Sequence, residues 1–131
     1  MAPGERPKRS VLLVEDHDDT RSMYRQFLEA LGFDVIEAAT CAETLAQATS
    51  HRVDVVVLDR GLVDGDGLDA CRALRADPRT KGLRIIVLSG HPESETIDDA
   101  DAYLLKPVVP DVLAVEIERA LARPVRRSAG S

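Results

Sequence analysis

The sequence predicts an α/β fold, a doubly wound three-layer sandwich in which helices cover both faces of a parallel sheet. Three observations lead to this class. Residues 53–59 (VDVVVLD) and 83–88 (LRIIVL) are short apolar runs rich in β-branched residues, typical of strands that are buried on both faces. Segments with helical apolar spacing separate such runs along the chain. Right-handed crossovers between parallel strands then place helices on both sides of the sheet.

Length and composition restrict the class of protein. The 131 residues are enough for one domain, which we place at residues 10–122, between a flexible N-terminal arm (1–9) and a disordered tail (123–131). The net charge of −6 argues against nucleic-acid binding. The sequence has neither an apolar run of about 20 residues nor a signal-peptide core, so we expect a cytoplasmic protein that does not contact membranes.

The strands expected from apolar runs are all short, and most end in polar or charged residues. Alternation in the second run suggests an edge strand, whereas the three consecutive valines of the third suggest the centre of the sheet. The expected strands are residues 10–14, 33–38, 53–59, 83–88 and 102–105.

The first helix is expected from Asp18 or Asp19, either of which could cap it, to Leu31, followed by Gly32 as a left-handed residue. Its predicted buried face is Met23, Phe27, Ala30 and Leu31. The other helices are expected at 42–50, at 68–76 and from Pro110 onward. Their predicted buried residues are Leu45, Ala48 and Thr49, then Leu68, Cys71 and Leu74, then Leu113, Ile117, Ala120 and Leu121.

The segment 90–101 lacks the pattern of a docked helix. Pro92 could open one, but Ile97 is its only large apolar residue, and five acidic side chains repel one another. We therefore expect at most one helical turn, that is, a shortened or missing fourth helix, which would leave the segment free to order against a partner.

Polar residues that follow the strands form a chemical pattern. Glu15 and Asp16 follow the first strand, Asp59 ends the third, Ser89 follows the fourth, and Lys106 follows the fifth. The carboxyl ends of parallel strands meet at one edge of a sheet, where ligands bind. Clustered carboxylates raise one another's pKa unless a cation neutralises them, and an all-oxygen site suits Mg²⁺. Together with a lysine and a hydroxyl, such a site could move a phosphoryl group onto a carboxylate. Each residue alone also has an ordinary role as a helix cap, a loop hydroxyl or a surface charge.

At this point the chain resembles the receiver domain of two-component response regulators, of the stand-alone single-domain type. The resemblance implies a flavodoxin-like sheet of order 2-1-3-4-5. The matching segments run in family order from residue 10 to residue 121: VLLVED (11–16), GFDV (32–35), DVVVLD (54–59), DG (66–67), IVLSG (86–90) and YLLKP (103–107).

The resemblance also implies a function. Asp59 would accept a phosphoryl group from a histidine kinase or histidine phosphotransfer protein, assisted by Lys106 and Ser89. Glu15, Asp16, Asp59 and the backbone carbonyl of Gly61 would hold Mg²⁺, with Mn²⁺ as a substitute, and the Lys106–Pro107 bond would be cis. Because a phosphoryl group carries about −1.5 to −2 charges, we also expect it to draw Ser89 toward it, and Tyr103 to rotate inward into the vacated space as the output switch.

The sequence departs from the family pattern in several places. Val63 stands where proline is usual, Gly61 brings no side chain to the site, Ser89 replaces the commoner threonine, and Cys41 stands at a position that is often glycine. The stretch between Ser89 and Lys106 is several residues shorter than usual. In typical receivers the fourth helix belongs to the dimer surface, so we expect a monomer or weak dimer.

Three functions remain open at this stage. The first is a signalling switch without an output domain, not an enzyme beyond self-phosphorylation and slow autodephosphorylation, that binds an unknown downstream protein or relays phosphate. The second is a magnesium-dependent phosphohydrolase of the haloacid type. That reading is weakened by Gly61, which stands where such enzymes carry a second acid. The third is a degenerate receiver that serves only as a scaffold.

Overall fold

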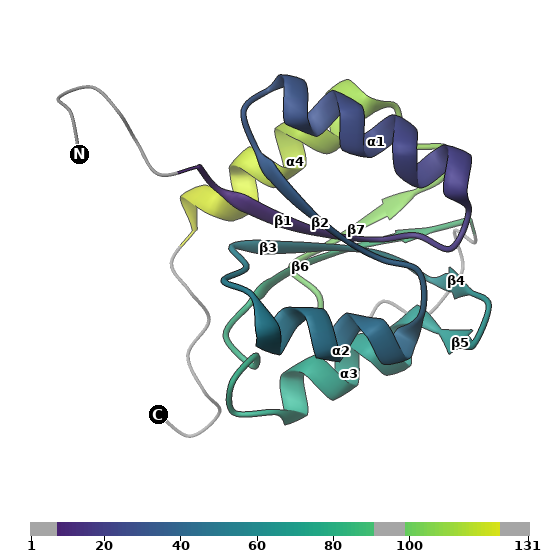
Figure 1. Cartoon of the computed structure of the whole chain (residues 1–131), viewed down its shortest axis with the longest axis vertical. Helices are drawn as coiled ribbons and strands as arrows, with labels where there is room; N and C mark the ends of the chain where they lie inside the picture. The colour runs from purple at the N-terminus through teal and green to yellow at the C-terminus, as the bar shows by residue number, and fades with distance from the viewer. Residues whose placement is uncertain (1–7, 91–98, 124–131) are drawn as a thin grey trace, which may run out of the picture.

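The computed structural model describes residues 8–90 and 99–123 and contains the predicted parallel sheet (Figure 1). The sheet has the order β2-β1-β3-β6-β7, and every neighbouring pair is parallel. Because β6 and β7 are its fourth and fifth strands along the chain, the order 2-1-3-4-5 is confirmed. The five strands are β1 (Ser10–Val14), β2 (Asp34–Ala38), β3 (Val55–Asp59), β6 (Arg84–Ser89) and β7 (Ala102–Leu105).

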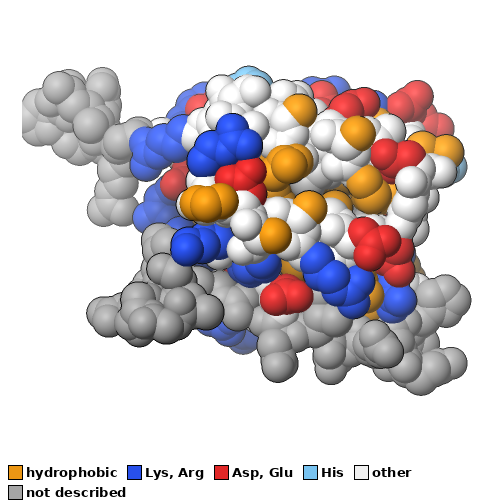
Figure 2. Space-filling view, turned by 90° about the horizontal axis from the view of Figure 1, so that it is seen from below, with side chains coloured by type: hydrophobic (Ala, Val, Ile, Leu, Met, Phe, Trp, Pro, Cys, Tyr) orange, Lys and Arg blue, Asp and Glu red, His pale blue; other side chains and the backbone are white. Residues whose placement is uncertain are grey.

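Helices cover both faces of this sheet and complete the three layers. Helices α1 (Asp18–Ala30) and α4 (Pro110–Ala122) lie on one face, and α2 (Cys41–Ser50) and α3 (Gly67–Ala76) lie on the other (Figure 1). Among the described residues, no helix is long and apolar enough to cross a membrane. Seen from below (Figure 2), Lys and Arg side chains are interspersed with acidic and apolar ones, so this face carries mixed charge.

The core consists of two apolar clusters, one on each face of the sheet. Alternate residues of one strand enter opposite clusters, so that Val55 and Val57 face α1 and α4 while Val56 and Leu58 face α2 and α3. All five residues of β3 are buried. This two-sided burial explains why the central strand is an unbroken apolar run rather than an alternating one.

Helix α1 buries a different face from the one predicted. Tyr24 and Leu28 are its buried residues, whereas the predicted Met23 and Leu31 are 43% and 53% exposed. Phe27 packs partly against the core, and Ala30 is exposed. The prediction failed because two apolar sets overlap on this helix, and a tyrosine was not counted as a core residue. Tyr24 can be buried because its hydroxyl donates a hydrogen bond to the carbonyl of Val108.

The ends of α1 were predicted with mixed success. The N-cap is His17, without a side-chain hydrogen bond, because Asp18 and Asp19 already lie inside the first turn, where their charge favours the helix N-terminus. At the other end Gly32 has φ of +98°, as predicted. Its N–H and that of Phe33 bond to the carbonyls of Glu29 and Leu28, which closes the helix with a Schellman motif.

In α2, Thr44 and Ala48 are buried, while the predicted Leu45 and Thr49 are only partly buried. The Thr44 hydroxyl bonds to the carbonyl of Thr40, so its burial leaves no polar atom unpaired. The predicted faces of α3 and α4 are confirmed, as is the start of α4 at Pro110.

The loop after Asp59 forms a small antiparallel hairpin that the sequence did not indicate. Strands β4 (Gly61–Leu62) and β5 (Gly65–Asp66) pair within it, and the side chain of Leu62 is buried. The carboxylate of Asp64 accepts the backbone N–H groups of Cys41 and Ala42 at the start of α2, at 2.7 and 3.2 Å. The loop is therefore anchored although Val63, 76% exposed, replaces the usual proline.

Some predictions concern residues outside the described parts of the chain. They are the arm before residue 8, the tail beyond residue 123 and most of the segment 90–101, of which residues 91–98 are not described. Within the described residues, no helix lies between β6 and β7.

Candidate functional site

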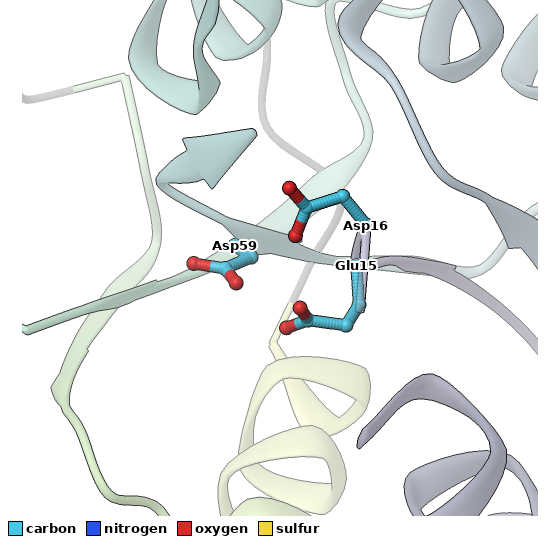
Figure 3. Close-up of side chains that lie close together, drawn as sticks. All are labelled: Glu15, Asp16 and Asp59. Atoms are coloured by element: carbon cyan, nitrogen blue, oxygen red, sulfur yellow. The ribbon is translucent and has the colours of Figure 1, made fainter. Parts of the chain in front are cut away.

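The carboxyl ends of two adjacent strands bring the predicted acidic residues together. Glu15 and Asp16 directly follow β1, and Asp59 is the last residue of β3. Figure 3 shows their side chains extending toward a common space, and each offers a carboxylate oxygen within 4.8 Å of the others. The adjacent strands β1 and β3 pair in parallel, which fixes this convergence through the backbone.

Asp59 is buried and is held by two donors. Its Oδ1 atom lies 2.7 Å from Nζ of Lys106, which follows β7, and accepts the backbone N–H of Gly61 at 3.0 Å. Only 2% of Asp59 is exposed, whereas 36% of the Lys106 side chain is. The predicted lysine therefore does reach the predicted nucleophile. The backbone carbonyl of Gly61 was predicted as a magnesium ligand, and the N–H of the same residue bonds to Asp59.

Glu15 carries the strongest electrostatic conflict in the site. Burial, together with the hydrogen bond and charge of Asp59, raises its pKa to about 8, although the backbone N–H of His17 and the charge of Lys106 favour the ionised form. A hard cation would remove this conflict, and three carboxylates are the donors that Mg²⁺ prefers. The residues present therefore fit a magnesium ion.

Arg21 fixes the loop that carries Glu15 and Asp16. Its guanidinium donates to the backbone carbonyl of Glu15 at 2.8 Å, to Glu37 at 3.1 Å and to Asp18 at 2.8 Å. These bonds tie the end of β1 to β2 and to the first turn of α1. Sequence reasoning gave Arg21 no role, because its partners belong to three different elements.

A pocket of about 540 Å³ opens beside the acidic cluster and is lined by both Lys106 and Tyr24. The Lys106–Pro107 bond at its wall is cis, as the resemblance implied. Burial and the negative charges of Glu15 and Asp59 raise the pKa of Tyr24, so its phenol stays protonated and donates to Val108. Tyr24 was missed by the sequence analysis, although it lies one helical turn before Leu28.

The predicted switch residues lie next to this site. Ser89 is buried at the end of β6, and Tyr103 on β7 is partly buried. The Tyr103 hydroxyl accepts a hydrogen bond from Arg60 at 3.1 Å. A second pocket, of about 500 Å³, is lined by Ser89, Arg60 and Lys106.

Comparison with known proteins agrees with this geometry. The family model of the response regulator receiver domain matches residues 11–118. The KDP operon transcriptional regulatory protein KdpE of Escherichia coli K12 is 37% identical over 119 residues, which are 87% of this chain and 52% of KdpE. The polar-differentiation response regulator DivK of Brucella anthropi is 28% identical over 105 residues, 76% of this chain and 85% of DivK. The chain thus spans about half the length of KdpE but most of the length of DivK.

Among solved structures, the receiver domain of the sensor histidine kinase PA1611 from Pseudomonas aeruginosa PAO1 superposes with a TM-score of 0.80 at 25% identity. The match covers 89% of this chain and all of that domain. That crystal structure holds a magnesium ion coordinated in its active-site cleft.

Proposed function

The chain belongs to the response regulator receiver family of two-component signalling, and from this premise we propose that it is a phosphorylation-controlled switch with Asp59 as phosphoacceptor. The donor is a histidine kinase or a histidine phosphotransfer protein. The signal leaves through binding of a downstream protein or through onward transfer of the phosphoryl group. A cytoplasmic location is part of this proposal.

One observation carries the assignment: the Asp59 carboxylate, buried among acidic neighbours, is bonded to Lys106 at 2.7 Å. Asp59 ends the central strand, beside a pocket lined by both residues, where a donor can approach.

The chemistry follows from the positions of the side chains. An oxygen of Asp59 attacks phosphorus, an O–P bond forms, and the N–P bond of the donor phosphohistidine breaks with its electron pair remaining on the imidazole. The Lys106 ammonium would stabilise the negative charge on the phosphoryl oxygens, and Ser89 would donate one hydrogen bond to them. Glu15, Asp16 and Asp59 would hold Mg²⁺, which supplies further charge neutralisation when bound.

The hydrolase alternative has less support. A haloacid-type enzyme needs a general acid two residues after its nucleophile, and Gly61 occupies that position. The Gly61 N–H instead binds Asp59 and can only orient it. The scaffold alternative leaves the convergence of three carboxylates and Lys106 without a purpose.

Incubation with acetyl phosphate and Mg²⁺ tests the proposal. Intact-mass analysis should show one added phosphate, and Asp59→Asn should abolish it. Asp69→Asn, which changes an exposed aspartate on α3, should be labelled like the wild type. Normal labelling of Asp59→Asn would refute the assignment, and continuous release of inorganic phosphate over many turnovers would favour the hydrolase.

A further inference from the structure

Tyr24 is a buried polar residue of α1 that borders the acidic cluster. Only 7% of it is exposed, and it packs in the apolar cluster on the α1 and α4 side of the sheet. Its hydroxyl donates a hydrogen bond of 2.5 Å to the backbone carbonyl of Val108. A buried phenol needs an acceptor for its hydroxyl, and many buried tyrosines find one in the nearest carbonyl. Here the acceptor lies two residues after Lys106, in the stretch of chain that carries the lysine of the site.

The backbone of Lys106 is held on one side by the sheet. Its N–H donates to the carbonyl of Ser89 at 2.7 Å, which continues the pairing of β6 with β7. Pro107 follows, and a proline has no N–H with which to extend that pairing. Helix α4 begins three residues later, at Pro110. Residues 107–109, the 107–109 link, therefore lie beyond the sheet and before the helix.

The Tyr24 hydroxyl binds this link at its middle residue. It does so from α1, which lies beside α4 on the same face of the sheet (Figure 1). Because α1 starts directly after the loop that carries Glu15 and Asp16, the bond joins the acidic half of the site to the half that carries the lysine. Lys106 is therefore fixed by the sheet through its own N–H and by α1 through the carbonyl of Val108.

The position of this backbone matters because the lysine side chain is long. Nζ of Lys106 lies 2.7 Å from Oδ1 of Asp59, although 36% of the lysine side chain is exposed. A lysine on its flexible four-carbon stem has many rotamers, so the place of its backbone decides how often the ammonium reaches the carboxylate. A misplacement of about 1 Å in a group that acts on the reacting atoms can slow a reaction roughly a hundredfold.

Tyr24 can hold the link without disturbing the charges of the site. It lines the pocket of about 540 Å³ together with Asp59, Lys106 and Val108. Burial and the neighbouring carboxylates raise the pKa of Tyr24, so its phenol is neutral at neutral pH. Replacing it by phenylalanine would therefore remove one hydrogen bond, keep the ring and leave the charge of the site unchanged.

We propose that Tyr24 is a positioning residue for phosphoryl transfer and acts through Lys106. By holding Val108, it keeps the 107–109 link fixed relative to α1, so that the ammonium is in place beside Asp59 when the phosphoryl group arrives. It acts on the reaction without contacting the phosphoryl group. This inference rests on the proposed function, because it takes Asp59 as the phosphoacceptor and Lys106 as the residue that stabilises the phosphoryl oxygens.

NMR of the lysine side chains tests the positioning in the unphosphorylated protein. The chain contains three lysines, so ¹³C labelling at Cε gives three resonances, and Lys106→Arg identifies the one from Lys106. Tyr24→Phe should shift that resonance and leave the other two, and because the ring is kept, the shift reports a change in the lysine. An unmoved Lys106 resonance in Tyr24→Phe overturns the proposal.

Thr44→Val is the matched control. It also removes a buried hydroxyl that bonds to a backbone carbonyl, but on α2, which covers the opposite face of the sheet. All three lysine resonances should keep their wild-type positions in this variant. A Lys106 resonance that moved as far in Thr44→Val as in Tyr24→Phe would show a general response to lost stability, which contradicts a specific role for Tyr24.

The consequence for the reaction is measured with acetyl phosphate and Mg²⁺. In Tyr24→Phe the rate of phosphate uptake at saturating acetyl phosphate should fall about fivefold, as expected when one hydrogen bond no longer supports the reacting geometry. The Mg²⁺ concentration that gives half of the maximal rate should stay at its wild-type value, because the three carboxylates keep their places. A wild-type rate contradicts the proposal, and so does a raised Mg²⁺ requirement, which would place the effect on the acidic residues.

Urea unfolding separates positioning from packing. Tyr24→Phe and Thr44→Val should both be less stable than the wild type, because each leaves a buried carbonyl with one donor fewer. Only Tyr24→Phe should be slow in phosphate uptake, and equal slowing of both variants would refute the role of Tyr24. Failure of the proposed function looks different: the wild type would then take up no phosphate on Asp59, while the Lys106 resonance would still report whether Tyr24 holds the lysine.

Discussion

Glu15 is a carboxylic acid with almost no access to water, since only 5% of the residue is exposed. Burial and the nearby Asp59 carboxylate raise its pKa from an ordinary value of 4.5 to about 8. Such a residue favours its neutral form in the folded chain and its ionised form in the unfolded chain. Glu15 therefore lowers the stability of the metal-free protein at neutral pH. The same buried carboxylate is a strong ligand for a cation.

This shift predicts how stability depends on pH. Between about pH 4.5 and pH 8 the folded protein binds a proton that the unfolded chain has lost, so the free energy of unfolding should fall as pH rises. Without metal, the unfolding temperature should therefore decrease from pH 5 to pH 8. Millimolar Mg²⁺ should reverse most of this loss at pH 8 and have little effect at pH 5.

Two variants isolate the contribution of Glu15. Glu15→Gln has no carboxylate to ionise, so its unfolding temperature should be flatter across this range than that of the wild type. Asp69→Asn on the exposed side of α3 should keep the wild-type slope. If Glu15→Gln kept the full wild-type slope, another group would be responsible.

At the scale of an element, α1 shows how a helix selects one apolar stripe out of two. Leu28 is completely buried and Leu31, three residues later, is 53% exposed. Both would satisfy a helical pattern. Leu28 packs in the cluster with Val11 and Val55, and its neighbour Tyr24 reaches across to the chain before α4. Contact with β1, β3 and α4 decides the face.

The two leucines provide a matched test. Leu28→Ala should lower the free energy of unfolding by about 3 kcal/mol, because it leaves a cavity in the core. Leu31→Ala makes the same chemical change on the surface and should cost less than about 0.5 kcal/mol. Urea unfolding of both variants measures the difference. Equal losses would show that the buried face has been assigned incorrectly.

At the scale of the whole molecule, Arg75 joins α3 to the far edge of the sheet. Its guanidinium donates to the carboxylate of Asp101 at 3.1 Å and to the backbone carbonyls of Lys81, Leu83 and Asp99. The Arg75 and Asp101 side chains are only 11% and 13% exposed. The same Asp101 carboxylate also accepts the N–H of Ile85. One arginine thus holds the end of α3, the loop before β6 and the chain that enters β7.

Removing this arginine should destabilise the whole fold. Arg75→Ala removes the buried positive charge that pairs with the Asp101 carboxylate and one donor from several carbonyls, and we expect a loss of about 3 kcal/mol. Arg72→Ala, one turn earlier on the same helix, breaks only an exposed pair and should cost less than about 0.5 kcal/mol. Urea unfolding distinguishes the two. A loss at Arg75 no larger than at Arg72 would contradict the role given to it.

The sequence by itself determined the architecture and which polar residues converge at one edge of the sheet. Strands buried on both faces carry unbroken apolar runs between their ends, so β1, β3 and β6 could be recognised locally. The residue that ends each strand follows from the strand, and parallel strands end at one edge. For this reason the sequence predicts that Glu15, Asp16, Asp59 and Lys106 lie near one another.

Only the tertiary structure decided which apolar stripe of α1 is buried and how the β4–β5 hairpin is anchored. It also decided which residues the arginine side chains bond to. The partners of Arg60 and Arg75 include residues 43 and 26 positions away. Long side chains with several rotamers can contact many neighbours, and the contact that forms depends on how the helices pack on the sheet. A local pattern predicts a helix or a strand because the spacing of its apolar residues follows the backbone geometry of that element. These arginines instead bond across elements, and the fold must exist before their partners are defined.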